Sequence, residues 1–505
     1  MALSDTPTMP QLGPSRRLWP LFLAFFAFSS LYVFLTILYN LFFHPLRRYP
    51  GPFLARISWL WSRIRNFHGC KSERIHAAHE RYGPIVRIGP NELSFANPAA
   101  VRDIYNSKSF VKEETFYRAK RIFHEDHMFS FRNVEAHNQR RKLLARGFSQ
   151  VAINQFETNL VSKIQTLLDQ WERLSRSTDE PINVYPWVHW LGFDTVYHLM
   201  FDEDPGSVKK GIADPIMKYL HAWRPTFIYK EFMPQLEQWG PYVPGEVGGY
   251  FRDVQTWKKV AMNIVGKVRV NGAKTPFLSN VLNDQDAYLG RPLNDSELAE
   301  ECMGGMFGGS GSTANTFVYV LWGCLRNPDV VRKLKQELTT AFPDRSVVPD
   351  NLTCSGLTYL QAAIKETLRR YPAVIATLPR TAVEDVVVAG HALPKGTIVG
   401  TQNYTLHRWT SAFPDAENFD PDRWFSKKSD EERKLAFTPF SVGPRRCIGM
   451  NLAEMELNLL TASFFLRFDA AIDPSMTEED MRQYDTFNAG PTGAKLLLHL
   501  KTVEE

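Results

Sequence analysis

The chain begins with a long hydrophobic stretch. No charged residue lies between Arg17 and His44, and residues 18–43 are mostly Leu, Phe, Ala, Tyr and Val. A helix of this length spans the ~30 Å hydrocarbon core of a bilayer at ~1.5 Å per residue. The stretch is too long for a signal-peptide core, and no small-residue cleavage site follows it. We therefore predict a transmembrane anchor over residues 18–43 after a short segment 1–17; a buried core helix is the alternative.

Proline and glycine interrupt the helical pattern directly after the hydrophobic stretch. Residues 44–52 read His-Pro-Leu-Arg-Arg-Tyr-Pro-Gly-Pro, which predicts a stiff, turned linker. Short apolar segments at 85–88 and 92–95, with Gly89-Pro90 between them, predict two strands of a small sheet. From about 151 to 286 the pattern is helical and carries no catalytic signature.

A second long helical pattern lies in the middle of the chain. Asn294 and Glu297 have the spacing of a capping box, and the pattern continues to Arg326 before Asn327-Pro328 ends it. We expect a helix on the order of 45 Å long. Five glycines lie inside it, and each costs about 1 kcal/mol relative to alanine. They are Gly304, Gly305, Gly308, Gly309 and Gly311. Such a cost indicates a function, such as close passage over a flat group with a local distortion of the helix.

Composition bounds the class of protein. At 505 residues the chain exceeds an ordinary domain, but no repeat or low-complexity linker divides it, so residues 53–505 are expected to form one large globular body. The net charge of +5 is small for this length and gives no case for nucleic-acid binding. The five cysteines are odd in number and form no CxxC pair, which argues against a disulfide framework and a zinc site.

The strongest candidate for chemistry is residues 440–449, Phe-Ser-Val-Gly-Pro-Arg-Arg-Cys-Ile-Gly, which directly precede a helical segment. A cysteine at a helix start beside guanidinium groups is well placed to be a thiolate, the form that binds a metal. Gly443 and Gly449 allow close approach to a flat cofactor, and Arg445 would then face an anion. A buried structural cysteine is the alternative for Cys447.

Phe440, Gly443, Arg445, Cys447 and Gly449 have the spacing F-x-x-G-x-R-x-C-x-G, which resembles the haem-ligand signature of the cytochrome P-450 family. The resemblance implies a mainly α fold with a small β region behind the N-terminal anchor. It also implies one haem b, iron protoporphyrin IX. Cys447 is then the axial thiolate of the iron, which activates dioxygen, and the other four residues surround the haem.

Further segments match the family in the same order along the chain. A helix would place His137 and Arg141 on one face, and many members hold a haem propionate with tryptophan and arginine at this spacing. Arg141 therefore carries over, whereas His137 departs from the tryptophan. Arg380 is expected on the other propionate. A solvated helix face is the alternative for His137 and Arg141.

Glu366-Thr-Leu-Arg369 places opposite charges three residues apart on a helix. Such a pair is usually a surface ion pair worth under ~1 kcal/mol. In the family, however, this motif forms a structural triad with a later arginine, which here is Arg423 in Pro421-Asp-Arg423-Trp424. We assign these three residues to the core beside the cysteine and not to the chemistry.

The glycine-rich segment Gly308–Ala314 has two other interpretations. Gly309-x-Gly311-x-x-Ala314 fits a dinucleotide fingerprint, but that motif follows a strand and here a helical pattern precedes it. A P-loop would need a lysine that is absent. The segment resembles the family's oxygen-activation segment, with Ser312 at the usual threonine position and Gly311 in place of the usual acid. Proton delivery is then expected from Ser312 or Thr313 with ordered water.

The substrate pocket is expected from apolar residues near these segments. Val374, Ile375 and Leu378 belong to a predicted strand over 374–380, and Phe487 resembles the last substrate-contact turn. Phe307 completes the predicted pocket from the central helix.

The resemblance implies a monooxygenase that inserts one atom of O2 into an apolar or aromatic small molecule, with further oxidation or ring closure as options. Too little chain follows Cys447 for a flavin domain, so electrons are expected from a separate NADPH-cytochrome P-450 reductase, docked near Arg446, Lys427 and Lys428. The linker resembles that of fungal microsomal members, which favours secondary metabolism.

Arginines flank both ends of the anchor, so the positive-inside rule does not orient it. The cysteine count and the electron donor favour a single-pass protein of the endoplasmic reticulum membrane with a cytosolic catalytic body. Because Gly311 replaces an acid, a reductase-independent isomerase or dehydratase stays open as an alternative. A non-catalytic haem-binding protein is the second alternative.

Overall fold

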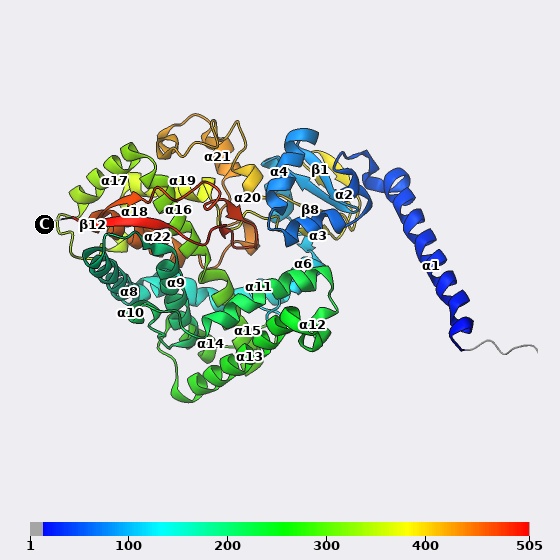
Figure 1. Cartoon of the computed structure of the whole chain (residues 1–505), viewed down its shortest axis with the longest axis horizontal. Coiled ribbons are helices and arrows are strands. Elements are labelled where there is room, and N and C mark those ends of the chain that lie inside the picture. Colours follow the sequence, from blue (N-terminus) through cyan, green and yellow to red (C-terminus); the bar gives the residue numbers. More distant parts are fainter. Residues whose placement is uncertain (1–13, 504–505) are drawn as a thin grey trace, which may run out of the picture.

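The structure is a computed structural model that describes residues 14–503, and it consists of a helical body with one helix extending from it (Figure 1). Helix α1 (Pro14–Leu38) continues into a π-helical turn, η1 (Tyr39–Phe43). Residues Leu21–Phe43 have a mean hydropathy of 2.3 and none of the apolar window is buried in the protein. The predicted anchor is therefore a helix long and apolar enough to cross a membrane. Most of the predicted segment 1–17 lies outside the described residues.

The body is mainly helical, as predicted. Its helices before the central one are α2 (Phe53–Ile57), α3 (Leu60–Phe67), α4 (Lys71–Tyr82), α5 (Ala99–Tyr105), α6 (Glu114–Ala119), α7 (Val134–Ala145), α8 (Gln150–Ser177), α9 (Val184–Phe201), α10 (Ser207–Lys210), α11 (Met217–Phe232), α12 (Leu236–Trp239), α13 (Gly245–Asn271) and α14 (Pro276–Asn283). The later helices are α15 (Asp295–Gly309), α16 (Ser312–Leu325), α17 (Pro328–Ala341), α18 (Asn351–Gly356), α19 (Thr358–Arg370), α20 (Asn403–Leu406), α21 (Asp430–Ala436) and α22 (Met450–Arg467).

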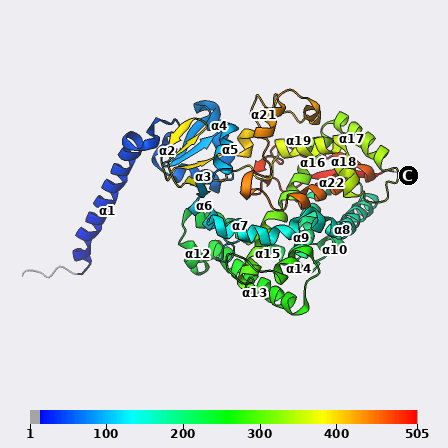
Figure 2. The same ribbon diagram turned by 180° about the vertical axis from the view of Figure 1, so that it is seen from behind.

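The β region is small, and its main sheet lies next to α1, beside α2 and α4 (Figures 1 and 2). Its main sheet has the order β1-β2-β8-β5-β3, in which β2 and β8 are parallel and the other neighbours are antiparallel. The strands are β1 (Ile85–Gly89), β2 (Glu92–Phe95), β3 (Phe110–Lys112), β4 (Ile182–Asn183), β5 (Arg380–Ala382), β6 (Val386–Val388), β7 (His391–Leu393), β8 (Ile398–Gly400), β9 (Phe468–Ile472), β10 (Gln483–Tyr484), β11 (Gly490–Pro491) and β12 (Leu497–Thr502).

The two strands predicted at 85–88 and 92–95 are confirmed as β1 and β2, with Ile85 opposite Phe95. The strand predicted over 374–380 is wrong, because only β5, which begins at Arg380, pairs with neighbours. Pro379 has no N–H to extend the ladder. The carbonyl oxygens of Val374 and Leu378 instead accept hydrogen bonds from side chains, at 3.0 Å from Asn403 and 3.1 Å from Tyr105.

The central helix begins as predicted but is not continuous. The Asn294 side chain accepts from the Glu297 N–H, and the Glu297 side chain accepts from the Asn294 N–H, so the capping box is confirmed. Helix α15 then ends at Gly309, and α16 starts at Ser312. The predicted single helix is therefore two helices, with a break at Ser310-Gly311.

The glycines of this helix serve mainly its packing. A Cβ on Gly304 would lie 2.5 Å from the His127 ring, and one on Gly305 would lie 2.3 Å from the Met200 sulfur. A Cβ on Gly309 would likewise meet a valine of α9 at 2.8 Å. At Gly308 a Cβ would meet no atom within 4 Å. Neighbouring side chains therefore exclude a Cβ at three of the five glycines, whereas Gly308 leaves the cavity wall bare.

The core of the body forms where α15 and α16 pack against α9, α19 and α22. Helix α16 is buried along almost its whole length, and so is α22 after its first turn. These helices hold the break at residues 310–311 opposite the loop that leads into α22. The site lies between these two features.

Candidate active site

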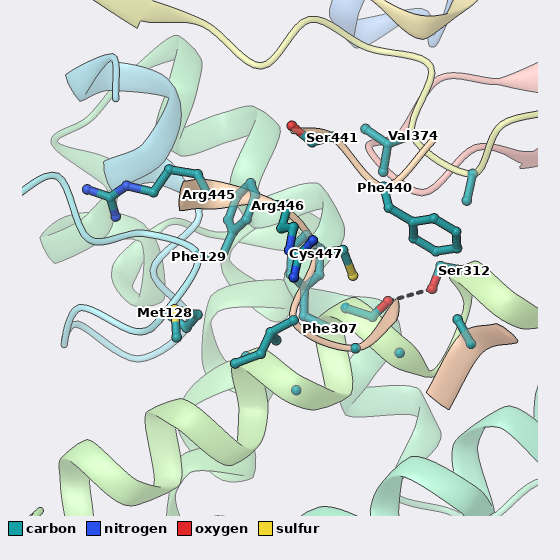
Figure 3. A pocket seen from close by; sticks show the side chains of 18 of the residues that line it. Met128, Phe129, Phe307, Ser312, Val374, Phe440, Ser441, Arg445, Arg446 and Cys447 are labelled. Carbon is teal, nitrogen blue, oxygen red and sulfur yellow. Dashed lines mark hydrogen bonds between the residues drawn. The ribbon is translucent and has the colours of Figure 1, made fainter. Parts of the chain in front are cut away.

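A cavity of about 290 Å³ lies between the cysteine loop, residues 440–449, and the helices α15 and α16. Figure 3 shows Arg445, Arg446 and Cys447 of the loop together with Phe307 of α15 and Ser312 of α16. Most of the lining is apolar, and polar side chains line the cavity from both the loop and the helices. The structure thus brings the two most informative segments of the sequence to opposite walls of one cavity.

Backbone hydrogen bonds and a left-handed glycine fix the cysteine loop. The Cys447 N–H donates to the Phe440 carbonyl at 2.9 Å, which closes the loop. Gly443 has φ +73°, and a Cβ there would lie 2.4 Å from the Tyr105 carbonyl oxygen. Position 443 therefore requires glycine, because its backbone packs closely against α5. Helix α22 begins directly afterwards at Met450.

The Cys447 side chain is exposed, and it lines the cavity inside the protein. Burial raises the pKa of its thiol, and the Gly449 N–H and the Arg141 guanidinium oppose this shift. Gly449 and Gly308 line the cavity from opposite sides, and a Cβ on either would meet no atom within 4 Å. No side chain therefore projects into the cavity from Gly308 on one wall or from Gly449 on the other, which leaves room for a flat group.

Four cations gather at one end of the cavity. Lys112, Arg141 and Arg445 line it, and Arg380 lies close to Arg445. Burial, together with the charge of Arg380, lowers the pKa of Arg445 to about 10. Among the described residues, no carboxylate lies within ion-pair distance of any of the four. This end of the cavity therefore has the charge that a ligand with two carboxylates requires.

The arginines predicted here are held by backbone carbonyls. Arg141 donates to the Arg446 carbonyl at 2.8 Å, and Arg445 donates to that of Phe131 at 3.2 Å. Arg380 is buried but does not line the cavity itself, because its guanidinium donates to the Tyr117 hydroxyl at 2.5 Å. Arg141 and Arg445 are thus placed to contact a ligand directly. Arg380 contributes its positive charge from behind the cavity wall.

His137 lines the cavity one helical turn before Arg141, so the predicted shared face of α7 is present. The ring is buried, and burial with the neighbouring charges of Arg445 and Lys112 lowers its pKa to about 3. His137 is therefore a neutral wall residue in this structure. Its role toward a propionate stays a prediction.

Lys112 is the cation that sequence reasoning missed. Its ammonium group donates to the Phe129 carbonyl at 2.6 Å and is covered by the Tyr117 ring, with the nitrogen 4.9 Å from the ring centroid. Burial and the nearby arginines lower its pKa well below the ordinary value. The sequence gives only a weak signal for Lys112, because it is a single lysine in a short strand and is distant in sequence from the other cations.

We expect Lys112→Met to weaken retention of the haem that the sequence resemblance implies. Losing one buried charge-assisted contact corresponds to roughly a tenfold faster loss of haem. The measurement is haem transfer to an excess of apomyoglobin, followed by absorbance. Lys108→Met, four residues earlier and exposed, is the control and should leave the rate unchanged. Equal rates for wild type and K112M would remove Lys112 from the anion site.

The predicted triad is present as a buried ion cluster. Arg369 makes two bonds to the Glu366 carboxylate, at 2.8 and 3.0 Å, and Arg423 donates to the same carboxylate at 3.0 Å. The Trp424 indole N–H adds a fourth bond at 3.1 Å. The side chains of Glu366 and Arg369 are fully buried, so this is no surface ion pair. The geometry fits the predicted structural role.

His407, which sequence reasoning did not single out, connects this cluster to the cysteine loop. Its Nδ1–H donates to the Arg369 carbonyl at 3.1 Å, and its Nε2 accepts from the Thr438 N–H at 3.1 Å. Burial and the charge of Arg369 lower its pKa to about 3, so it stays neutral. The segment that leads to Cys447 is thereby fixed to the triad.

Three aromatic rings form one wall of the cavity, and Lys112 lies against one of them, Phe129. Phe307 and Phe487 stack with centroids 4.9 Å apart, and Phe129 meets Phe487 edge-on at 5.0 Å. Phe487 has φ +78°, an unusual value for a residue with a side chain. Phe307 and Phe487 were predicted for this wall, whereas Phe129, from the loop after α6, was not.

Of the remaining predicted pocket residues, two line the cavity and one does not. Val374 and Leu378 line the cavity with the phenylalanines. Ile375 does not line it: its side chain is buried on the other side of the segment, facing a separate surface pocket. The Ile375 carbonyl accepts a hydrogen bond from the Tyr404 N–H at 3.4 Å, and Tyr404 lines the same surface pocket as Ile375.

Of the three residues predicted at the break, Ser312 and Thr313 line the cavity and Gly311 does not. The Ser312 hydroxyl donates to the Gly308 carbonyl at 2.6 Å and so spans the break. A Cβ on Gly311 would lie 3.0 Å from Nη2 of Arg224, a residue of α11. An arginine therefore lies where the side chain of the absent acid would extend.

Comparison with known proteins agrees with this geometry. The family model for cytochrome P-450 matches residues 49–498. Cytochrome P-450 monooxygenase tazI of Aspergillus terreus is 31% identical over 492 residues, covering 92% of this chain and 96% of the relative. Benzoate 4-monooxygenase bphA of Aspergillus niger is 29% identical over 457 residues, covering 84% of this chain and 87% of the relative. A crystal structure of the cytochrome P-450DA heme domain superposes with a TM-score of 0.77 at 20% identity, covering 90% of this chain and 98% of that chain.

The chain therefore belongs to the cytochrome P-450 family, with the fold predicted for it. It is an oxygen-incorporating oxidoreductase, and its cofactor is haem. The residues present fit that cofactor: Cys447 would bind the iron, the cations would hold the propionates, and the bare glycine walls leave room for the flat ring. When bound, haem supplies the activation of dioxygen.

Proposed function

We propose that this monooxygenase oxidises an apolar aromatic small molecule of fungal secondary metabolism. The observation that carries the proposal is the wall of phenylalanines, Phe129, Phe307 and Phe487, above the cysteine loop. Stacked and edge-on rings favour a planar aromatic guest, and the apolar wall that these rings form leaves the hydroxylation position to shape. The reaction proposed is hydroxylation, with further oxidation or ring closure as extensions.

The similar proteins support this substrate class. Among them are monooxygenases from Aspergillus, Emericella and Dothistroma, and one is named for benzoate, an aromatic acid. Benzoate is the substrate in the relative's name. For this chain, that name supports the proposal that the substrate is aromatic.

The residues of this chain have distinct parts in the proposed reaction. Phe307 and Phe487 bind and orient the substrate, and Val374 and Leu378 exclude water from it. The break between α15 and α16 keeps space open over the cysteine loop, and the Thr313 hydroxyl is placed to pass protons there. The triad and His407 keep Cys447 in place.

We place the protein in the endoplasmic reticulum membrane, as a single-pass protein with a cytosolic body that receives electrons from NADPH through a separate reductase. The apolar helix α1 supports the membrane attachment. Arg446, Lys427 and Lys428 are exposed cations, which suit docking of an acidic partner near the cysteine side.

The test is NADPH consumption by the purified full chain with NADPH-cytochrome P-450 reductase and O2. We expect members of a panel of benzoate and two- and three-ring aromatic compounds to stimulate consumption and to yield oxygenated product. Omitting the reductase is the control and should abolish both. Stimulation by saturated fatty acids instead of aromatic compounds would contradict the substrate class.

The reductase-independent isomerase or dehydratase is the second candidate, because no acid stands at Gly311 and Arg224 lies there instead. The same assay separates the two functions when a lipid hydroperoxide is added without NADPH. Rapid rearrangement of the hydroperoxide, with no NADPH-dependent product, would favour the isomerase. A haem-binding protein without turnover would give neither product.

A further inference from the structure

The break between α15 and α16 leaves two carbonyls of α15 without their helical partners. The Ser310 N–H still donates to the Met306 carbonyl at 3.1 Å, but among the described residues no backbone N–H donates to the carbonyls of Phe307 and Gly308. A continuous helix would pair the Phe307 carbonyl with the N–H of Gly311, four residues further on. Because an unpaired buried carbonyl is costly, the break requires donors from elsewhere.

Two side chains supply these donors. The Ser312 hydroxyl donates to the Gly308 carbonyl at 2.6 Å, and the Asn488 amide donates to the Phe307 carbonyl at 3.0 Å. Ser312 belongs to the central helix itself. Asn488 instead lies in the turn between β10 and β11, where it lines the cavity with 3% of its surface exposed. The last turn of α15 is therefore paired with a residue from a distant part of the chain.

The turn that carries Asn488 is fixed to its surroundings on both sides. The Ala489 N–H donates to the Ala373 carbonyl at 2.7 Å, in a segment that lines the cavity. A Cβ on Gly490 would lie 2.9 Å from the Asn315 side chain of α16, so the backbone of the turn packs directly on that helix. The turn thus packs on α16 while the Asn488 amide binds the end of α15, and it connects the two helices across the break.

The same contact joins the break to the aromatic wall. Phe487, the residue before Asn488, has φ +78° and stacks on the Phe307 ring with the centroids 4.9 Å apart. The backbone of Phe307 is bonded to Asn488. Loss of the Asn488 bond would therefore affect both the end of α15 and the relative position of the two rings.

We propose that Asn488 is a positioning residue that holds the break between α15 and α16 open. Its amide occupies the Phe307 carbonyl, which the Gly311 N–H would otherwise take, so the helix does not close across the cavity. Asn488 acts on the reaction through Phe307 and the space beside it. Its effect on turnover rests on the proposed monooxygenase function, whereas its effect on the helix does not.

The first test measures amide hydrogen exchange by mass spectrometry in the haem-loaded full chain, for wild type and Asn488→Leu. Leucine is close to asparagine in size but donates no hydrogen bond. We expect the released Phe307 carbonyl to accept from the Gly311 N–H, which slows exchange in peptides containing Gly311 at least roughly fivefold. Equal or faster exchange in N488L would overturn the inference. If N488L does not load haem, Asn488→Ala, which also lacks the donor, takes its place with the same expected result.

Gln483→Leu is the matched control. Gln483 lies on β10 of the same hairpin, and its amide donates to the Pro372 carbonyl at 3.0 Å, outside the cavity. This variant removes a bond of the same kind without touching the break. Q483L should therefore keep wild-type exchange at Gly311, and equally slowed exchange in both variants would overturn the inference.

The second test measures product formed per NADPH with the panel compound that most stimulates NADPH consumption. N488L should form at least roughly threefold less product per NADPH than Q483L, with hydrogen peroxide formed from O2 instead. A merely structural amide would lower haem content and Tm but leave product per NADPH unchanged, and that result would overturn the inference. If wild type forms no product from any panel compound, the substrate class fails, while the exchange measurement still decides the role of Asn488.

Discussion

Replacing Cys447 by serine is expected to reduce monooxygenase turnover to below about one thousandth of the wild-type rate. A serine hydroxyl cannot replace a thiolate as the iron ligand, and Cys447 is the cysteine that opens on the cavity. The cations and the bare glycine walls remain, so the variant should still bind haem. The measurement is NADPH-dependent product formation, together with the absorption spectrum of the reduced, carbon-monoxide-bound protein.

The matched control is Cys70→Ser, since Cys70 is a half-buried free cysteine before α4, outside the cavity. This variant should keep both the spectrum and the activity of wild type. A thiolate spectrum in C447S, or its loss in C70S, would contradict the assignment of Cys447.

Glu366→Ala is expected to have the largest effect on stability. Arg369 and Arg423 both donate to this fully buried carboxylate, so its removal leaves two guanidinium groups without their anion. Breaking a buried ion pair by removing one partner costs about 3–5 kcal/mol. That is a large part of the ~5–15 kcal/mol that stabilises a typical protein. The measurement is the yield of haem-loaded protein and the Tm of whatever folds.

Glu431→Ala serves as the control, because Glu431 forms an exposed pair with Lys434 on α21. Exposed pairs contribute little, so yield and Tm should match wild type. A stable, fully loaded E366A protein would show that the cluster does not hold the cysteine-side core.

Much of the fold could be predicted from local patterns. The apolar run before His44, the capping box at Asn294 and the short strand segment at Ile85 each depend on neighbouring residues, and each appears in the structure. The strand over 374–380 was wrong because Pro379, which cannot donate to a ladder, outweighed the apolar run. The side chains that bind the carbonyls of Val374 and Leu378 are distant in sequence. The break at Gly311 likewise depends on contacts that only the folded chain makes.

The residues of the site likewise fall into those that the sequence predicts and those that only the fold reveals. The cysteine loop and the triad were found because their residues have fixed spacings that match a family. Lys112 and His407 have no such spacing, since their importance comes from burial beside residues distant in sequence. Ile375 shows the converse error: an apolar residue between pocket residues that faces the other way.

The most direct test of the central claim, an oxygen-incorporating haem enzyme acting on an aromatic guest, uses isotopically labelled dioxygen. The labelled dioxygen is incubated with the full chain, the reductase, NADPH and the aromatic panel compound that most stimulates NADPH consumption. The mass of the product is then measured by mass spectrometry. One labelled oxygen atom in each product molecule is the predicted result. Product that carries only unlabelled oxygen, or that forms equally without NADPH, would contradict the account.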